Sequence, residues 1–492
     1  MSRLHFLTQL VHHPDAFSVL LLVVLCLLGV AGAYFASRID LTVLMISALI
    51  LQLFSGNWSL MGIPIPLDRV VFVLTLGALL LKGTRYLSSR RLVWRPLHIA
   101  LLCAVTWVVV SGLIAGTITG HVGFYAFLDR FGLVPFVLFT LAPLFFGSQR
   151  QRRLLLGALV GMGLYLGLTG CMEGLHLYKL IFPRYIANPN LGIQWGRARG
   201  PILESTGDGF CTFVGGVAAV IGLQTWRSAR ARRLCYATIA VDLATEFFTL
   251  TRSVWIGTVL GIVAVMMLRR KTRRIVIPAL LAGVIVVGST LALVPSVRTE
   301  VVGRTEAQSP VWDRQNTDLA ALRIIEEKPL TGVGWENFIN VSSNYMRQQP
   351  TYPITGEGIE VHNVFLSHAA ELGIPGLLLW LLALGGAVRR GLFPGRTKRR
   401  PDRAQAGHDA DLEMWRLGGL AIVLFFLVIA DLAPFSQALP NSLLWLWLGV
   451  AAAPYTSRLR LSALHRRSLP QTLPFSPPRP LPSVPELQPV HL

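Results

Sequence analysis

Arg252 is the first residue of this sequence whose type and position suggest chemistry. It lies between two apolar runs, and Thr251 and Ser253 are its only polar neighbours. Charged groups at membrane depth are costly, so those that occur there are functional candidates. A guanidinium group can bind phosphate oxygens through two parallel hydrogen bonds. The alternative is a simple hairpin turn wetted by interfacial water.

Two further arginines, Arg197 and Arg199, lie in the glycine-flanked run Gly196–Gly200. Together with Arg252 they are expected to converge on one anion, since a pyrophosphate carries enough charge to need two or three such partners. An ordinary polar loop is the alternative for either residue.

Arg130 is a fourth candidate for the same anion, at the start of an apolar segment. Asp129 precedes it, and a local ion pair between the two is the simpler explanation. We therefore rank Arg130 below the other three arginines.

His362 begins the segment His362–Leu366, where a long polar loop returns to apolar sequence. Its imidazole titrates near neutrality, so it can accept a proton from a hydroxyl group; a helix cap is the alternative role. His368 is expected to face another side of the helix. The Glu357–Glu360 pair is predicted to be a solvated loop rather than a divalent-ion site. No spacing of a metal site is present, so we predict neither metal nor cofactor.

The elements that position these residues are predicted to be membrane-spanning helices. The chain has 492 residues, of which 53% are hydrophobic and only 14% are charged. Soluble domains carry about 25% charged residues. Segments such as Phe17–Ala36 and Ile275–Val294 contain no charge and are long enough to cross the hydrocarbon core. The five cysteines have no zinc or redox spacing, and we expect them to pack in the interior.

Net charge of +20 does not indicate nucleic-acid binding here, because the charge is clustered. Of the 45 Lys and Arg residues, 29 lie in six short runs between apolar segments, which is typical of cytoplasmic loops. The apolar windows, whose bounds are good to a few residues, are 17–36, 41–55, 70–82, 97–117, 131–147, 154–173, 209–226, 235–250, 253–268, 275–294, 374–388, 416–434 and 440–455. Since 41–55 and 70–82 are short, we favour about 12 transmembrane helices (11–13) in an all-α, polytopic domain over residues 1–456; the side of the amino terminus stays open.

The alternation of basic runs places the 295–362 loop outside, on the side of the membrane opposite the cytoplasm. This loop carries more acidic than basic residues, the reverse of the cytoplasmic bias. Within it, Ala307–Glu327 is predicted to be a helix that ends at Lys328–Pro329. Residues 457–492 are Pro-rich and are predicted to be a disordered cytoplasmic tail.

Three motifs in order resemble the O-antigen ligase/polymerase superfamily of bacterial surface-polysaccharide assembly. They are Phe248–Ile256, which contains Thr-Arg-Ser, then Glu327–Phe338, which reads Glu-Lys-Pro-Leu-Thr-Gly-Val-Gly-Trp-Glu-Asn-Phe, and His362–Leu366 followed by Glu371–Leu377. The specific resemblance covers roughly residues 200–390, and the hydrophobic pattern extends it over the rest. Thr251 and Ser253 replace the Ser and Gly that usually flank the family arginine.

The resemblance implies a metal-independent, inverting glycosyl transfer at the periplasmic face. It implies an undecaprenyl-pyrophosphate-linked glycan as donor, and a glycan or lipid A-core as acceptor. By position, Arg252 matches the arginine that holds the pyrophosphate, Arg199 its expected partner, and His362 the histidine that activates the acceptor. Ligase and polymerase stay open, with polymerase slightly favoured. A secondary transporter of a small polar or anionic solute is the alternative from another class.

Overall fold

The computed structural model describes residues 27–89, 96–293, 295–306, 308–393 and 403–452, and all of its regular elements are helical. The predicted tail, 457–492, lies outside the described residues. The first half of the chain contains a helix over Leu27–Ala36 and then α3 (Leu41–Leu51), η1 (Gln52–Phe54), η2 (Trp58–Met61), α4 (Leu67–Ser89), α5 (Pro96–Ile114), α6 (His121–Ala126), η3 (Phe127–Phe131), α7 (Leu133–Phe145), α8 (Gln149–Gly174), η4 (Tyr178–Leu180), η5 (Arg184–Ala187), α9 (Ser205–Thr225) and α10 (Ala229–Phe248).

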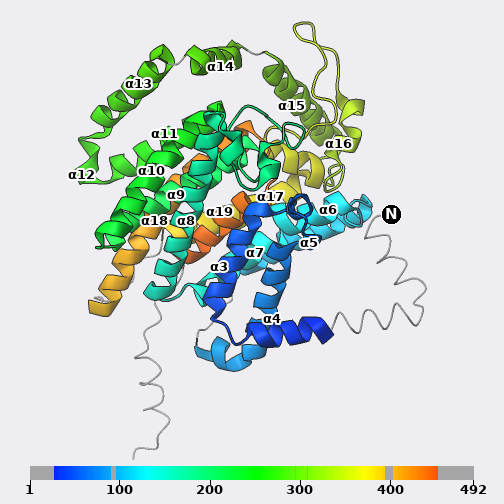
Figure 1. The fold of residues 1–492 in the computed structure, drawn as a ribbon. Coiled ribbons are helices and arrows are strands. Elements are labelled where there is room, and N and C mark those ends of the chain that lie inside the picture. Colours follow the sequence, from blue (N-terminus) through cyan, green and yellow to red (C-terminus); the bar gives the residue numbers. More distant parts are fainter. Residues whose placement is uncertain (1–26, 90–95, 294, 307, 394–402, 453–492) are drawn as a thin grey trace, which may run out of the picture. The chain divides into compact units, whose positions relative to one another are not determined.

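The second half continues in the same way and contains the long predicted loop (Figure 1). Its elements are α11 (Arg252–Leu268), α12 (Arg270–Arg273), α13 (Val276–Leu293), α14 (Pro295–Glu306), α15 (Ser309–Glu327), α16 (Phe338–Val341), η6 (Ser342–Tyr345), α17 (Val364–Leu392), α18 (Arg403–Leu432) and α19 (Ala438–Ala451). The predicted helix over 307–327 is confirmed as α15, which ends before Lys328.

A polytopic helical membrane protein is thereby confirmed, whereas the count of twelve spans is not. Among the described residues, seven helices are long and apolar enough to cross a membrane, or eight if the Leu27–Ala36 helix and Leu41–Phe54, bent by 117°, form one span. The helices α11 and α19 are apolar but shorter. The share of buried residues ranges from 6% in Val276–Leu293 to 78% in Ser205–Thr225. Thus α9 lies in the core, and α13 presents its apolar side chains outward.

Small residues bring α8, α9 and α10 close together (Figure 1). A Cβ atom added to Gly215 of α9 would lie 2.5 Å from the Cα atom of Gly163 in α8, so the two backbones touch. The same glycines make room for the buried carboxyl group of Asp242 on α10. This packing fixes the end of α10, from which the chain turns directly into α11.

The break in α17 positions the 329–334 segment. Gly373 has φ 70° and ψ 175°, and Pro375 has no N–H to donate to the carbonyl group of Glu371, four residues earlier. The freed carbonyl of Glu371 accepts instead from the backbone N–H of Gly334 at 2.9 Å. Likewise Ile374 donates to the carbonyl of Pro329 at 2.8 Å. Two of the sequence motifs are therefore one structural unit, in which the 329–334 segment pairs with the broken helix.

Candidate functional site

The N-termini of α9 and α11 meet at one end of the helical domain. The segments 175–208 and 309–363 lie at the same end, which we call the loop end. The hydroxyl groups of Ser205, the first residue of α9, and Thr251, the N-cap of α11, are 2.9 Å apart. The exposed side chain of Arg252 follows as the first residue of α11. Helix N-termini carry partial positive charge and favour anions.

Arg197 reaches the same place from the loop before α9. Its Nη1 donates to the hydroxyl oxygen of Thr251 at 3.3 Å, and its side chain is partly exposed. The structure therefore brings Arg197 next to the residue that precedes Arg252. Glu204, the N-cap of α9, lies in the same region, where burial raises its pKa and the charge of Arg197 partly opposes this rise.

The side chain of Arg199 points into the 175–208 loop itself. Its side chain is 1% exposed, and its Nη2 donates to the carbonyl groups of Ile186 at 3.1 Å and Asn188 at 2.8 Å. The guanidinium group also lies 4.7 Å from the ring centroid of Trp195, and its burial lowers the pKa of Arg199. Loop carbonyl groups accept from both Nη atoms, and the carboxylate of Glu173 lies 3.9 Å from Nε, so this arginine holds the loop together. Arg197 is thus the one that donates to Thr251, and which of the two arginines binds the pyrophosphate stays a prediction.

Arg314 on α15 is a cationic neighbour that the sequence did not single out. Burial lowers its pKa, and the positive charge of Arg252 lowers it further, while Asp318 opposes the shift. The two guanidinium groups are therefore close enough to repel each other. Asp318 in turn has its pKa raised to about 6, chiefly by burial. No spacing in the sequence could have indicated this pair, because α15 and α11 are far apart in the chain.

The charge of Arg314 also acts on His362. Burial and the charge of Arg314 lower the pKa of His362 below its ordinary value, against Asp313 and a hydrogen bond to the backbone of Glu360. Its Nδ1 atom is buried and has no hydrogen-bond partner among the described residues. The imidazole is therefore neutral near pH 7, as a general base must be. That Arg252 and His362 share one cavity stays a prediction.

Arg130 ties three segments together at the loop end. It donates from Nη1 to Glu336 at 2.7 Å, from Nη2 to Glu360 at 2.7 Å, and from Nε to the carbonyl group of Ser436 at 3.1 Å. The simple local pair with Asp129 is wrong, because that carboxylate pairs with Arg69 at 2.6 Å. Arg130 thus links the segment before His362 to the chain near Glu336 and to the start of α19, and its predicted role at the pyrophosphate stays a prediction.

The acidic pair and the second histidine also have definite places. Glu357 is exposed, as predicted for a solvated loop. The same prediction is wrong for Glu360, which is bound to Arg130. His368 lies inside α17, with its ring 4.8 Å from that of Trp380. Within the described part of the chain, no three His, Cys, Asp or Glu side chains are grouped so that they could hold a metal ion.

The region that contains these residues matches a known family. Residues 237–381 match the family model described as O-antigen ligase, which confirms the resemblance seen in the motifs. The matched range includes Arg252, Arg314 and His362, whereas Arg130 and Arg197 lie before it. The match supports, in general terms, a function of the O-antigen ligase or polymerase type. No curated protein matches the chain.

Proposed function

We propose that this protein transfers a glycan from a polyprenyl-pyrophosphate carrier to a hydroxyl group of a glycan acceptor, by the reaction of an O-antigen polymerase or ligase. The observation that carries the proposal is that Arg252 begins α11 next to the Thr251 hydroxyl group to which Arg197 donates, in a region where the charge of Arg314 acts on His362. It combines two cations that suit a pyrophosphate with a neutral imidazole that suits a hydroxyl group.

The anion site consists of Arg252, Arg314 and Arg197 beside the N-termini of α9 and α11. Two neighbouring guanidinium groups repel each other, and an anion bound between them is stabilised by both. A pyrophosphate group relieves this repulsion and gains charge-assisted hydrogen bonds. Positive charge placed in advance at this position also stabilises the negative charge that develops on the leaving group.

In the proposed reaction, the acceptor oxygen attacks the anomeric carbon of the donor glycan. The bond between that carbon and the pyrophosphate oxygen breaks, and its electron pair leaves with the polyprenyl pyrophosphate. His362 takes the proton of the acceptor hydroxyl group. Attack opposite the leaving group inverts the anomeric configuration. The guanidinium groups and the imidazole supply the charge stabilisation and the base that this step needs.

The loop end is proposed to face the periplasm. Basic runs lie at the opposite ends of the helices, at the start of α8, at the start of α10 and at the end of α17. Short loops rich in Lys and Arg stay in the cytoplasm. The chemistry would then occur where carrier-linked glycans are exposed after their export, in the inner membrane and with the carboxyl terminus in the cytoplasm.

The experiment that tests the function is an analysis of carrier-linked glycans in cells that lack the protein. Single repeats that accumulate on the carrier would indicate a polymerase, and long chains that stay on the carrier would indicate a ligase acting on lipid A-core. Arg252→Ala and His362→Ala should fail to restore the normal glycan, whereas Arg298→Ala, which removes an exposed arginine of α14, should restore it. Unchanged carrier-linked glycans in the deletion strain would refute the proposal.

A further inference from the structure

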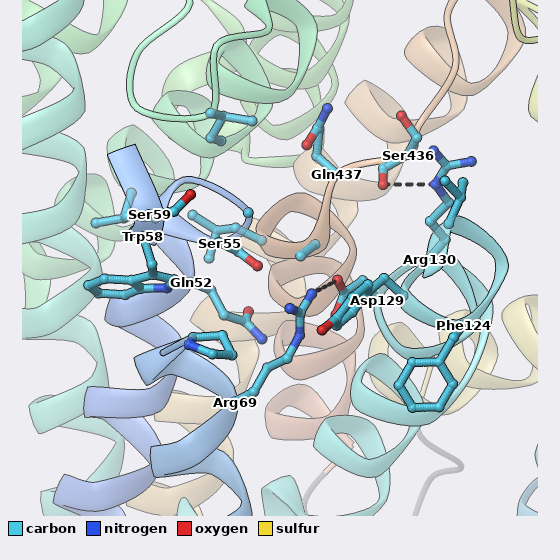
Figure 2. A pocket seen from close by; sticks show the side chains of 18 of the residues that line it. Gln52, Ser55, Trp58, Ser59, Arg69, Phe124, Asp129, Arg130, Ser436 and Gln437 are labelled. Atoms are coloured by element: carbon cyan, nitrogen blue, oxygen red, sulfur yellow. Dashed lines mark hydrogen bonds and ion pairs between the residues drawn. The ribbon is translucent and has the colours of Figure 1, made fainter. Parts of the chain in front are cut away.

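A cavity of about 910 Å³ lies beside Arg130, at the loop end. Its wall is formed by the connection between α3 and α4, by η3 with the residues before it, and by the start of α19 (Figure 2). The volume is in the range of roughly 300–1,000 Å³ that is usual for sites of small organic ligands. The pyrophosphate site proposed above does not use this space.

The lining combines flat apolar groups with uncharged polar groups. Trp58 and Phe124 provide aromatic surface, while Gln52, Ser59 and Gln437 provide amide and hydroxyl groups (Figure 2). Tyr125 adds a third aromatic ring to the lining. Aromatic rings offer rigid apolar faces, on which the C–H face of a sugar ring can lie. Amides and hydroxyls both donate and accept, which matches the hydroxyl groups of a saccharide.

The charges at the cavity are paired with each other. Arg69 binds Asp129 at 2.6 Å and lies 4.1 Å from the ring centroid of Tyr125, and Arg130 is held by two carboxylates. An anionic group entering here would have to displace an existing ion pair. A polyprenyl chain would offer no hydrogen bonds to polar lining groups such as Ser59 and Gln437. The lining therefore suits an uncharged, hydroxyl-rich ligand best.

The cavity is joined to the proposed reaction centre at two points. Arg130 lines it and donates to Glu360, two residues before His362. Gln437 lines it too, and its Cγ atom lies 3.4 Å from the place that a Cβ atom of Gly207, in the first turn of α9, would take. We propose that this cavity binds the saccharide of the acceptor and presents its hydroxyl group towards His362. The inference rests on the proposed function.

A binding experiment with the purified, full-length protein in lipid nanodiscs tests the proposal. The probe is an oligosaccharide released by mild acid from the surface glycan of the source organism, observed by saturation-transfer NMR. Ser59→Trp, which fills the cavity, should weaken binding at least about tenfold, and Gln437→Ala should weaken it severalfold. Leu60→Trp is the matched control, because Leu60 is exposed next to Ser59 but does not line the cavity.

Binding of inorganic pyrophosphate to the same samples shows that the loop end is folded. The affinity for pyrophosphate should stay within twofold of wild type in all three variants. Oligosaccharide binding that Ser59→Trp leaves unchanged, or that Leu60→Trp weakens equally, would overturn the proposal. Loss of polyprenyl-phosphate binding in Ser59→Trp, with oligosaccharide binding intact, would overturn it in favour of a lipid site. Failure of the proposed function itself would appear separately, as normal glycan in cells with His362→Ala.

Discussion

The hydroxyl groups of Ser205 and Thr251 lie 2.9 Å apart and join the first turns of α9 and α11. Arg197 donates to the same Thr251 hydroxyl group, and Arg252 follows it directly. Two helix N-termini and two arginines therefore meet at one point. Because partial charges of helix ends act only within about one turn, this proximity is what makes the point suitable for an anion.

Removing the charge of Arg197 is expected to weaken ligand binding, whereas removing the charge of Arg199 is expected to destabilise the protein. Arg197→Gln should weaken pyrophosphate binding about tenfold and leave the thermal midpoint unchanged, because its side chain is partly exposed. Arg199→Gln should lower the midpoint, since hydrogen bonds to buried charged groups contribute roughly 1.5–3 kcal/mol each. Titration calorimetry with inorganic pyrophosphate and thermal unfolding in detergent measure the two effects. The opposite pattern would show that Arg199 is the anion ligand.

The charge of Arg314 is expected to set the acid limit of the reaction. Burial and this charge lower the pKa of His362, so the neutral base persists as the pH falls to about 6.5, the ordinary value. Removal of the charge in Arg314→Gln raises the pKa of His362, and the rate should then begin to fall at a higher pH. The measurement is kcat/KM for transfer between pH 5 and 8. An acid limb that moves to lower pH would contradict the assignment.

Arg130 is expected to act through Glu360 and not through the pyrophosphate. Arg130→Gln leaves Glu336 and Glu360 without their partner, which should destabilise the protein by about 1–3 kcal/mol and slow transfer. Pyrophosphate affinity should stay within twofold. A double-mutant cycle with Glu360→Gln should show a coupling of at least ~0.5 kcal/mol in stability. Strict additivity, or a loss of pyrophosphate binding, would show that Arg130 has another role.

Gly332 is expected to tolerate no side chain. It has φ +62°, and an added Cβ atom would lie 2.5 Å from the carbonyl oxygen of Ala370, which accepts from Val333. Gly332→Ala should therefore cost about 1–3 kcal/mol of stability and separate the 329–334 segment from α17. Gly303→Ala on α14 is the control, since no atom lies within 4 Å of its added Cβ. Equal thermal midpoints for the two variants would contradict the proposed pairing.

Local patterns in the sequence predict much of this fold. Charge-free windows of the length of a membrane span predict long apolar helices such as α5, α8 and α9, because burial in lipid requires both properties. The helix α15 and its end before Lys328 follow from helix-forming residues and the proline that comes next. The number of membrane spans does not follow from these patterns. Short helices such as α11 are apolar enough to span a membrane but do not have the required length.

The site is less predictable, because its contacts join segments far apart in the sequence. Arg197 and Arg199 have nearly the same local context, and only the fold of the 175–208 loop buries one and exposes the other. Arg130 and Glu360 are 230 residues apart, and no pattern indicates their contact. Arg314 lies on a helix that was predicted, but its approach to Arg252 depends on how α15 folds back over the loop end.

The rate of glycan transfer by purified His362→Ala protein, at saturating carrier-linked donor, tests the central claim most directly. His176→Asn, which changes an exposed histidine of the 175–208 loop, is the matched control. Loss of a general base typically slows a reaction about 10²–10⁴-fold. We predict a fall of this size for His362→Ala, with pyrophosphate binding within twofold of wild type. A transfer rate within twofold of wild type would contradict the account.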